Sequence, residues 1–104
     1  MMYGLPEGVI ESLVNVMAME ERIEKTVLFG SRVKGTYSEG SDIDLCLVGN
    51  DLDLAALSRL EEHIDDLYFP WTVDLVPAAS ISDPALVDHI HRVGATIYER
   101  GHNT

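Results

Sequence analysis

Apolar residues recur at helical spacing in three stretches of the chain, over residues 6–19, 53–67 and 83–93. Because one helical turn takes about 3.6 residues, apolar positions three and four apart fall on one face, with polar residues opposite. The second stretch has Asp51 or Asp53 available as an N-cap, and the third begins at an Asp-Pro pair and stops before a glycine. We therefore predict three amphipathic helices at these positions.

Short β-prone segments lie between and after the helices. Residues 26–29 form an apolar run that ends at a glycine, residues 41–48 alternate apolar and polar positions, and residues 71–76 lie between two prolines. Residues 95–98 add a short terminal strand. Helices interleaved with a few strands are typical of an α/β or α+β domain. We therefore predict a small mixed β-sheet covered by helices on at least one face.

Length and apolar content place the chain in a simple class. Its 104 residues suffice for one hydrophobic core but not for a catalytic domain plus a substrate domain, so we expect a single domain over 1–104. Its apolar runs are far shorter than the roughly 20 residues that span a bilayer, and its first residues lack the pattern of a secretory signal. The lone Cys46 fits a reducing compartment. Together these features predict a cytoplasmic protein that does not bind membranes.

The chain is strongly acidic, with 18 Asp and Glu against 7 Lys and Arg and a formal net charge of −11 at pH 7. This balance opposes non-specific binding to a polyanion such as DNA. Two of the basic residues, Arg32 and Lys34, nonetheless follow Gly30-Ser31 closely, where a small anionic ligand benefits from positive charge. The sequence therefore argues against broad nucleic-acid binding and indicates a local anion site.

The segment around Gly30 and Ser31 has the features of a phosphate-binding turn. A β-prone run leads into it, and a stretch able to begin a helix follows. A glycine lets the backbone approach a phosphate, amides at a helix start point at the anion, and the Ser31 hydroxyl adds a donor. Gly-Ser after a strand is also common in ordinary tight turns. The feature therefore gains weight only together with the acidic residues that follow.

Three aspartates occupy positions from which their carboxylates share one side of the predicted sheet. In the strand over 41–48, apolar residues alternate with Asp42 and Asp44, which therefore lie on the opposite face. Asp74 lies on the polar face of the strand over 71–76 in the same way. Such residues also occur on ordinary solvated strand faces. Aspartate is, however, depleted from strands, and like charges on one face repel, so the arrangement favours a cation site.

Three carboxylates across from a phosphate-binding turn suit Mg²⁺, because hard cations prefer oxygen ligands. Two such ions, roughly 3.5 to 4 Å apart, would bridge a nucleoside triphosphate and activate an attacking hydroxyl. Attack at the α-phosphate with loss of pyrophosphate requires little more of a protein than this clamp and good positioning. The residues thus predict nucleotidyl transfer, with Mg²⁺ as cofactor and a nucleoside triphosphate as donor.

The order of these residues, Gly30-Ser31, ten residues, then Asp42-Ile43-Asp44, resembles the signature of the DNA polymerase β nucleotidyltransferase superfamily. The likeness is closest to the minimal nucleotidyltransferases and extends over residues 26–76. It implies a polymerase β-like fold. It also implies catalytic and metal-binding roles for Asp42, Asp44 and Asp74, the last as metal ligand or general base, and nucleotide-binding roles for Gly30, Ser31 and Ser41. The positive charge of Arg32 beside the turn adds this residue to the expected nucleotide-binding set.

The same resemblance implies a partner protein. Members of the group commonly work with a separate helical protein, either a substrate-binding subunit or a HEPN-type toxin, and some act as antitoxins by adding AMP to it. ATP is then the expected donor. The alternative is a non-catalytic binding module that neutralises a helical partner by complex formation, and the three intact carboxylates favour the enzyme over it. The acceptor, the preferred nucleotide and the number of nucleotides added stay open.

Overall fold

The computed structural model describes residues 2–101, and every predicted helix and strand is present in it. No helix within these residues is long and apolar enough to cross a membrane. In chain order the elements are α1 (Val9–Ala18), β1 (Ile23–Phe29), α2 (Ser31–Lys34), β2 (Ile43–Gly49), α3 (Leu54–Asp65), β3 (Val73–Pro77), the 3₁₀ helix η1 (Ala78–Ser80), α4 (Pro84–Val93) and β4 (Ala95–Glu99).

The strands form one four-stranded mixed sheet in the order β3-β2-β1-β4. β1 pairs antiparallel with both β2 and β4. β2 and β3 run parallel, because α3 carries the chain back along the sheet between them. The predicted small mixed sheet is therefore confirmed.

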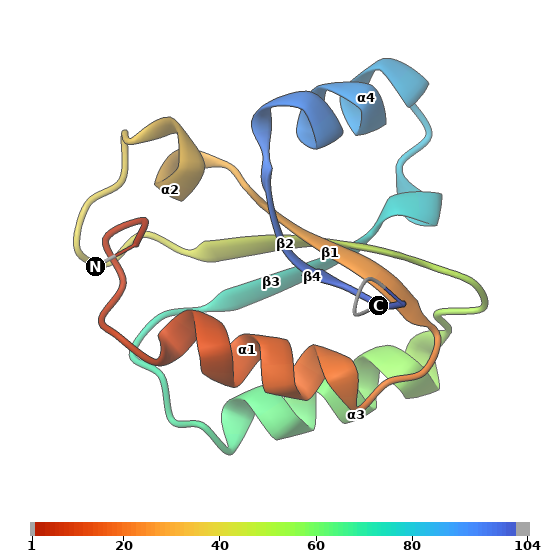
Figure 1. Cartoon of the computed structure of the whole chain (residues 1–104), viewed down its shortest axis with the longest axis horizontal. Coiled ribbons are helices and arrows are strands. Elements are labelled where there is room, and N and C mark those ends of the chain that lie inside the picture. Colours follow the sequence, from red (N-terminus) through yellow and green to blue (C-terminus); the bar gives the residue numbers. More distant parts are fainter. Residues whose placement is uncertain (1, 102–104) are drawn as a thin grey trace.

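Helices cover both faces of the sheet: α1 and α3 lie on one side and α4 on the other (Figure 1). The larger core joins buried residues of α1 and α3 to Leu45 of β2. The smaller core joins Cys46 of β2 to Ile90 of α4. Because successive residues of a strand point to opposite faces, Asp44 shares the α4 side of the sheet with Cys46.

Local backbone chemistry sets where the helices begin. The Asp53 carboxylate accepts a hydrogen bond from the Ala56 amide at 2.9 Å, and Asp83 caps α4 through the Ala85 amide at 2.9 Å. Of the two candidate caps of the second helix, Asp53 is thus the one used. The first helix begins later than predicted because Gly8 has a φ of 89°, which a right-handed helix cannot contain.

The strand predicted over 41–48 begins instead at Ile43, which corrects the expected position of Asp42. The Ser41 amide donates to the Ser38 carbonyl at 3.2 Å in a turn, rather than to a neighbouring strand. Asp42 therefore lies at the end of a loop, and only the second aspartate of the motif belongs to β2.

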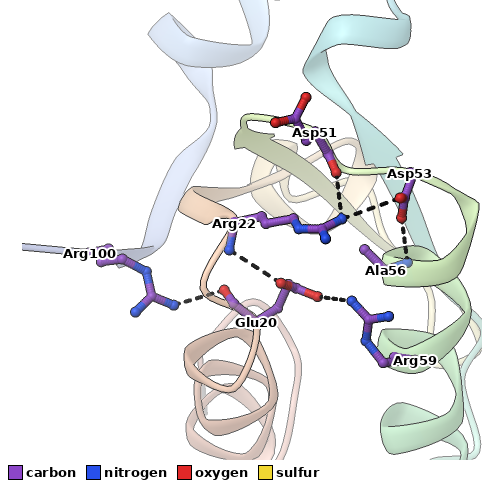
Figure 2. A network of polar contacts seen from close by, with 7 residues as sticks. All are labelled: Glu20, Arg22, Asp51, Asp53, Ala56, Arg59 and Arg100. Carbon is purple, nitrogen blue, oxygen red and sulfur yellow. Dashed lines mark hydrogen bonds and ion pairs between the residues drawn. The ribbon is translucent and has the colours of Figure 1, made fainter.

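A polar network joins the end of α1 to β1 and α3, as Figure 2 shows. The Glu20 carboxylate accepts hydrogen bonds from the Arg59 guanidinium at 2.8 Å and from the Arg22 amide at 3.3 Å. Arg22 in turn donates to the Asp51 carbonyl at 2.9 Å and lies 3.3 Å from the Asp53 carboxylate. The Arg59 hydrogen bond is the main cause that holds the pKa of Glu20 below its ordinary value.

Candidate active site

The predicted site residues gather where three segments meet at one end of the central strands. In the β1–β2 register Phe29 pairs with Asp44, which brings the Gly30-Ser31 turn beside this aspartate. In the parallel β2–β3 register Asp44 pairs with Asp74. Paired residues of neighbouring strands point to the same face. The turn and the two aspartates thus share one region, on the sheet face that carries α4.

Gly30 has a conformation and a neighbour that both require glycine. Its φ of 82° and ψ of −154° lie where residues with a side chain are rarely found. A Cβ at this position would collide with Oδ2 of Asp44, so that carboxylate lies directly over the turn. α2 begins immediately afterwards at Ser31. The fold therefore holds the central aspartate against the backbone of the expected phosphate-binding segment.

The three carboxylates are close enough to act on one another electrostatically. Asp44 is half-buried, whereas Asp42 and Asp74 are exposed. Burial is the main cause that raises the pKa of Asp44, and the charges of Asp74 and then Asp42 raise it further. A carboxylate whose ionisation is disfavoured in this way benefits most from a nearby cation.

The donor set of this cluster fits a hard divalent cation. Carboxylate oxygens are the ligands that Mg²⁺ prefers, and every influence that shifts the pKa of Asp44 disfavours its negative charge. Within residues 2–101, no three His, Cys, Asp or Glu side chains converge as a ready metal-ligand set. A bound cation would offset the like-charge repulsion among the carboxylates. The fit therefore rests on the chemistry of the three aspartates and on the sheet face that Asp44 and Asp74 share.

Arg32 lies differently from the other predicted nucleotide-binding residues. It is only 2% exposed, and its guanidinium donates to the Ser41 carbonyl at 3.1 and 2.8 Å, the Tyr3 carbonyl at 3.0 Å and the Glu39 carbonyl at 3.4 Å. These bonds engage most of the N–H donors of a guanidinium. A phosphate contact would require some of them to break. The structure thus directs Arg32 toward the loop before β2.

Ser41 belongs to the same loop. Its hydroxyl accepts a hydrogen bond from the Ser38 amide at 2.8 Å, while its carbonyl accepts from Arg32. Side chain and backbone therefore both organise the turn that precedes Asp42. The hydroxyl proton of Ser41 is available to the Ser38 hydroxyl at 3.4 Å or to an anion.

Two contacts in and beside this loop were missed by the sequence reasoning. The indole Nε1 of Trp71 donates to the Glu39 carbonyl at 2.9 Å, and the Tyr3 carbonyl receives one Arg32 bond. The sequence pattern assigns Trp71 only to the apolar face of its strand. Backbone carbonyls of a loop leave no periodic signal, so neither contact follows from residue spacing.

Comparison with solved structures defines the class of fold. A toxin–antitoxin structure with AMP-PNP matches with a TM-score of 0.72 at 23% identity, covering 89% of this chain and 75% of that chain. The structure of a tri-AMPylated Shewanella oneidensis HEPN toxin in complex with MNT antitoxin matches with a TM-score of 0.62 at 22% identity, covering 86% of this chain and 69% of that chain. At these identities the likeness concerns fold, which is that of the polymerase β-like nucleotidyltransferases.

Sequence comparison extends the likeness to a family. The family model described as polymerase beta, nucleotidyltransferase matches residues 11–103. A probable protein adenylyltransferase, MntA, of Haemophilus influenzae is 35% identical over 82 residues, which cover 67% of this chain and 72% of that protein. The chain therefore belongs to the polymerase beta nucleotidyltransferase family, and it is a nucleotidyltransferase. The resemblance inferred from the Gly-Ser and Asp-Ile-Asp motif is confirmed.

Proposed function

We propose that this chain is a Mg²⁺-dependent adenylyltransferase that transfers AMP from ATP to a hydroxyl group of a helical HEPN-type partner, and so acts as an antitoxin. The observation that carries the proposal is the placement of Asp44 over the Gly30 turn and directly across from Asp74. Two comparisons support the acceptor class. The Haemophilus relative is named a probable protein adenylyltransferase, and the Shewanella complex contains an AMPylated HEPN toxin.

The proposed reaction exchanges one phosphorus–oxygen bond for another. The acceptor oxygen bonds to the α-phosphorus of ATP while the bond to the α–β bridging oxygen breaks, and pyrophosphate leaves with that electron pair. The acceptor hydroxyl loses its proton in the same step. We assign this proton to Asp74, which is exposed and therefore accessible to a hydroxyl on another protein.

The other groups of the site bind and orient the donor. The backbone of the Gly30 turn and the Ser31 hydroxyl hold phosphate oxygens, and Ser41 adds a second hydroxyl from the loop before β2. Asp42 and Asp44 would be the principal ligands of Mg²⁺, and Asp74 would complete the set. Bound Mg²⁺ would neutralise the triphosphate and assist the departure of pyrophosphate.

The test is transfer of label to a protein acceptor. The chain is incubated with Mg²⁺, the proposed HEPN-type partner, and ATP labelled at either the α- or the γ-phosphate. We expect α-label on the partner and an intact mass raised by whole AMP units, while γ-label remains in pyrophosphate. Removal of Mg²⁺ with EDTA should abolish transfer.

The matched variants are Asp44→Asn and Asp88→Asn, each of which removes one carboxylate. We expect Asp44→Asn to lower transfer roughly a hundredfold or more, whereas Asp88→Asn, on the exposed side of α4, should transfer normally. If the partner binds the chain but receives no α-label with Mg²⁺ present, neutralisation by complex formation alone replaces adenylyl transfer as the function toward that partner.

A further inference from the structure

The loop between α2 and β2 is held from outside by side chains of two other segments. This loop covers residues 35–42 and contains no helix or strand. Its Glu39 carbonyl accepts hydrogen bonds from Arg32 at 3.4 Å and from the Trp71 indole at 2.9 Å. Its Ser41 carbonyl accepts two more from Arg32. The loop backbone is therefore fixed by bonds that do not depend on secondary structure.

These bonds join the three segments that carry the proposed ligands. Arg32 directly follows Ser31, and the Ser41 carbonyl directly precedes Asp42. Trp71 lies shortly before Asp74 in the chain. A bond network at Glu39 and Ser41 therefore sets where the Gly-Ser turn, the loop aspartate and the β3 aspartate stand relative to one another.

Aromatic packing and the N-terminal turn complete the surroundings of the guanidinium. The Arg32 Cζ lies 5.4 Å from the centroid of the Tyr37 ring and 5.6 Å from that of the Trp71 ring. Tyr3 and Gly4 have φ values of 58° and 72°, as in a type I′ turn, and the Tyr3 carbonyl accepts an Arg32 bond at 3.0 Å. Burying a cation is costly because it loses its hydration. The many hydrogen bonds and ring contacts of the Arg32 guanidinium therefore indicate that this side chain has a structural role in positioning its neighbours.

We propose that Arg32 and Trp71 are positioning residues, which hold Asp42 in register with Ser31 and Asp74 through the carbonyls of Glu39 and Ser41. The expected effect on catalysis rests on the proposed function. The structural role of Arg32 and Trp71 in the loop does not depend on it. Lysine cannot replace Arg32 in this task. A single ammonium lacks the planar fork that reaches three separate carbonyls, although it keeps the charge.

The first measurement uses Trp71 fluorescence, because this is the sole tryptophan of the chain. In Arg32→Lys the loop loses its main anchor, so we expect a red-shifted emission and stronger quenching by acrylamide than in the wild type. The control is Arg92→Lys, which alters an arginine 65% exposed in its side chain and should leave the emission unchanged. Wild-type emission and quenching in a folded Arg32→Lys would overturn the proposal.

The second measurement separates positioning from direct phosphate binding in steady-state kinetics of AMP transfer. A displacement of about 1 Å at a reacting centre costs on the order of a hundredfold in rate. We therefore expect Arg32→Lys to lower kcat by about that factor with little change in KM for ATP. A phosphate ligand would behave differently: lysine would preserve much of kcat, and KM for ATP would carry the loss. Either that pattern or wild-type kinetics would overturn the proposal.

Trp71→Phe provides an independent variant if Arg32→Lys fails to fold. It keeps an aromatic ring but removes the Nε1 donor to Glu39, so kcat should fall while the KM for ATP stays near that of the wild type. Because both side chains act on one carbonyl, the double variant should lose less than the product of the two single losses. Full additivity would overturn the proposal. If the wild type itself transfers no AMP, the proposed function fails, while the fluorescence comparison still tests the loop anchor.

Discussion

The carboxylate of Asp44 lies over the Gly30 turn and directly across from Asp74. Burial and the charges of Asp74 and Asp42 raise its pKa, so ionisation of this residue opposes folding in the free protein. The same repulsion favours binding of a divalent cation. We therefore expect these single residues to lower the stability of the free chain and to raise its affinity for a metal–nucleotide complex.

Because its ionised carboxylate destabilises the free protein, we predict that Asp44→Asn stabilises the metal-free protein at neutral pH. The variant removes one of two like charges that face each other on paired strands, which we expect to gain up to about 1 kcal/mol. In a domain of this size that corresponds to a rise in Tm of roughly 4 to 8 °C. Thermal unfolding in EDTA measures it, with Asp88→Asn as the control. A lower Tm for Asp44→Asn would contradict the proposed repulsion.

The turn itself predicts an order of effects at Gly30 and Ser31. Gly30→Val forces a β-branched residue into positive φ and displaces the Asp44 carboxylate, so it should nearly abolish nucleotide binding. Ser31→Ala removes one hydroxyl donor and should weaken binding by about 1 kcal/mol, or roughly fivefold. Titration with Mg²⁺ and a non-hydrolysable ATP analogue compares them. Tighter binding by Gly30→Val than by Ser31→Ala would argue against a backbone cradle.

The sequence alone predicts the location of some site residues better than that of others. The face that Asp44 and Asp74 take follows from strand alternation, since a strand fixes which face a residue takes, whereas Asp42 precedes β2 and follows only from the motif spacing. The direction of Arg32 does not follow in this way. Its partners are carbonyls of Tyr3, Glu39 and Ser41, and any residue type can supply a carbonyl, so charge alone suggested a ligand contact.

For the helices and strands, the periodicity of apolar residues predicts the type of each element well but does not predict how much of the element is buried. The apolar stripe of α4 correctly predicts a helix, yet only Ile90 is buried, while Leu86 and Val93 are 46% and 43% exposed. A helical pattern does not reveal how much of its apolar face the rest of the chain covers. β1 likewise begins at Ile23, earlier than the predicted residue 26, because pairing with β2 and β4 extends it through polar residues.

The segment between α1 and β1 contacts α3 through an ion pair whose effect depends on pH (Figure 2). Glu20 accepts from Arg59, and this bond keeps the pKa of Glu20 below its ordinary value of 4.5. A carboxyl with a lowered pKa in the folded state stabilises the fold above its unfolded pKa, and this contribution is lost as the pH falls through the folded pKa.

We therefore expect Glu20→Gln to lower the free energy of unfolding by about 1 kcal/mol at pH 7. The difference between the variant and the wild type should shrink as the pH falls below about 4.5. Urea unfolding at several pH values measures this difference, and Glu24→Gln, on an exposed position of β1, is the matched control. A difference that stays constant down to pH 3 would show that Glu20 acts through packing rather than charge.

The molecule as a whole has a charge and a surface suited to a basic partner. Its net charge is −11, and α4 leaves apolar side chains exposed on the same sheet face as the aspartate cluster. Complementary charge accelerates association and is screened by salt. We expect the dissociation constant of the complex with the proposed helical partner to rise several-fold between low and high NaCl, as biolayer interferometry would record. Affinity independent of salt would contradict electrostatic complementarity.

The most direct test of the central claim is whether Mg²⁺ and ATP together stabilise the fold through the aspartate cluster. A ligand at ten times its dissociation constant stabilises the native state by about 1.4 kcal/mol, which thermal unfolding detects readily. We predict that Mg²⁺–ATP raises the Tm of the wild type, and that the variant carrying both Asp42→Asn and Asp44→Asn loses the Mg²⁺-dependent part of that rise. An equal Mg²⁺–ATP shift in the double variant would place the nucleotide site elsewhere in the molecule.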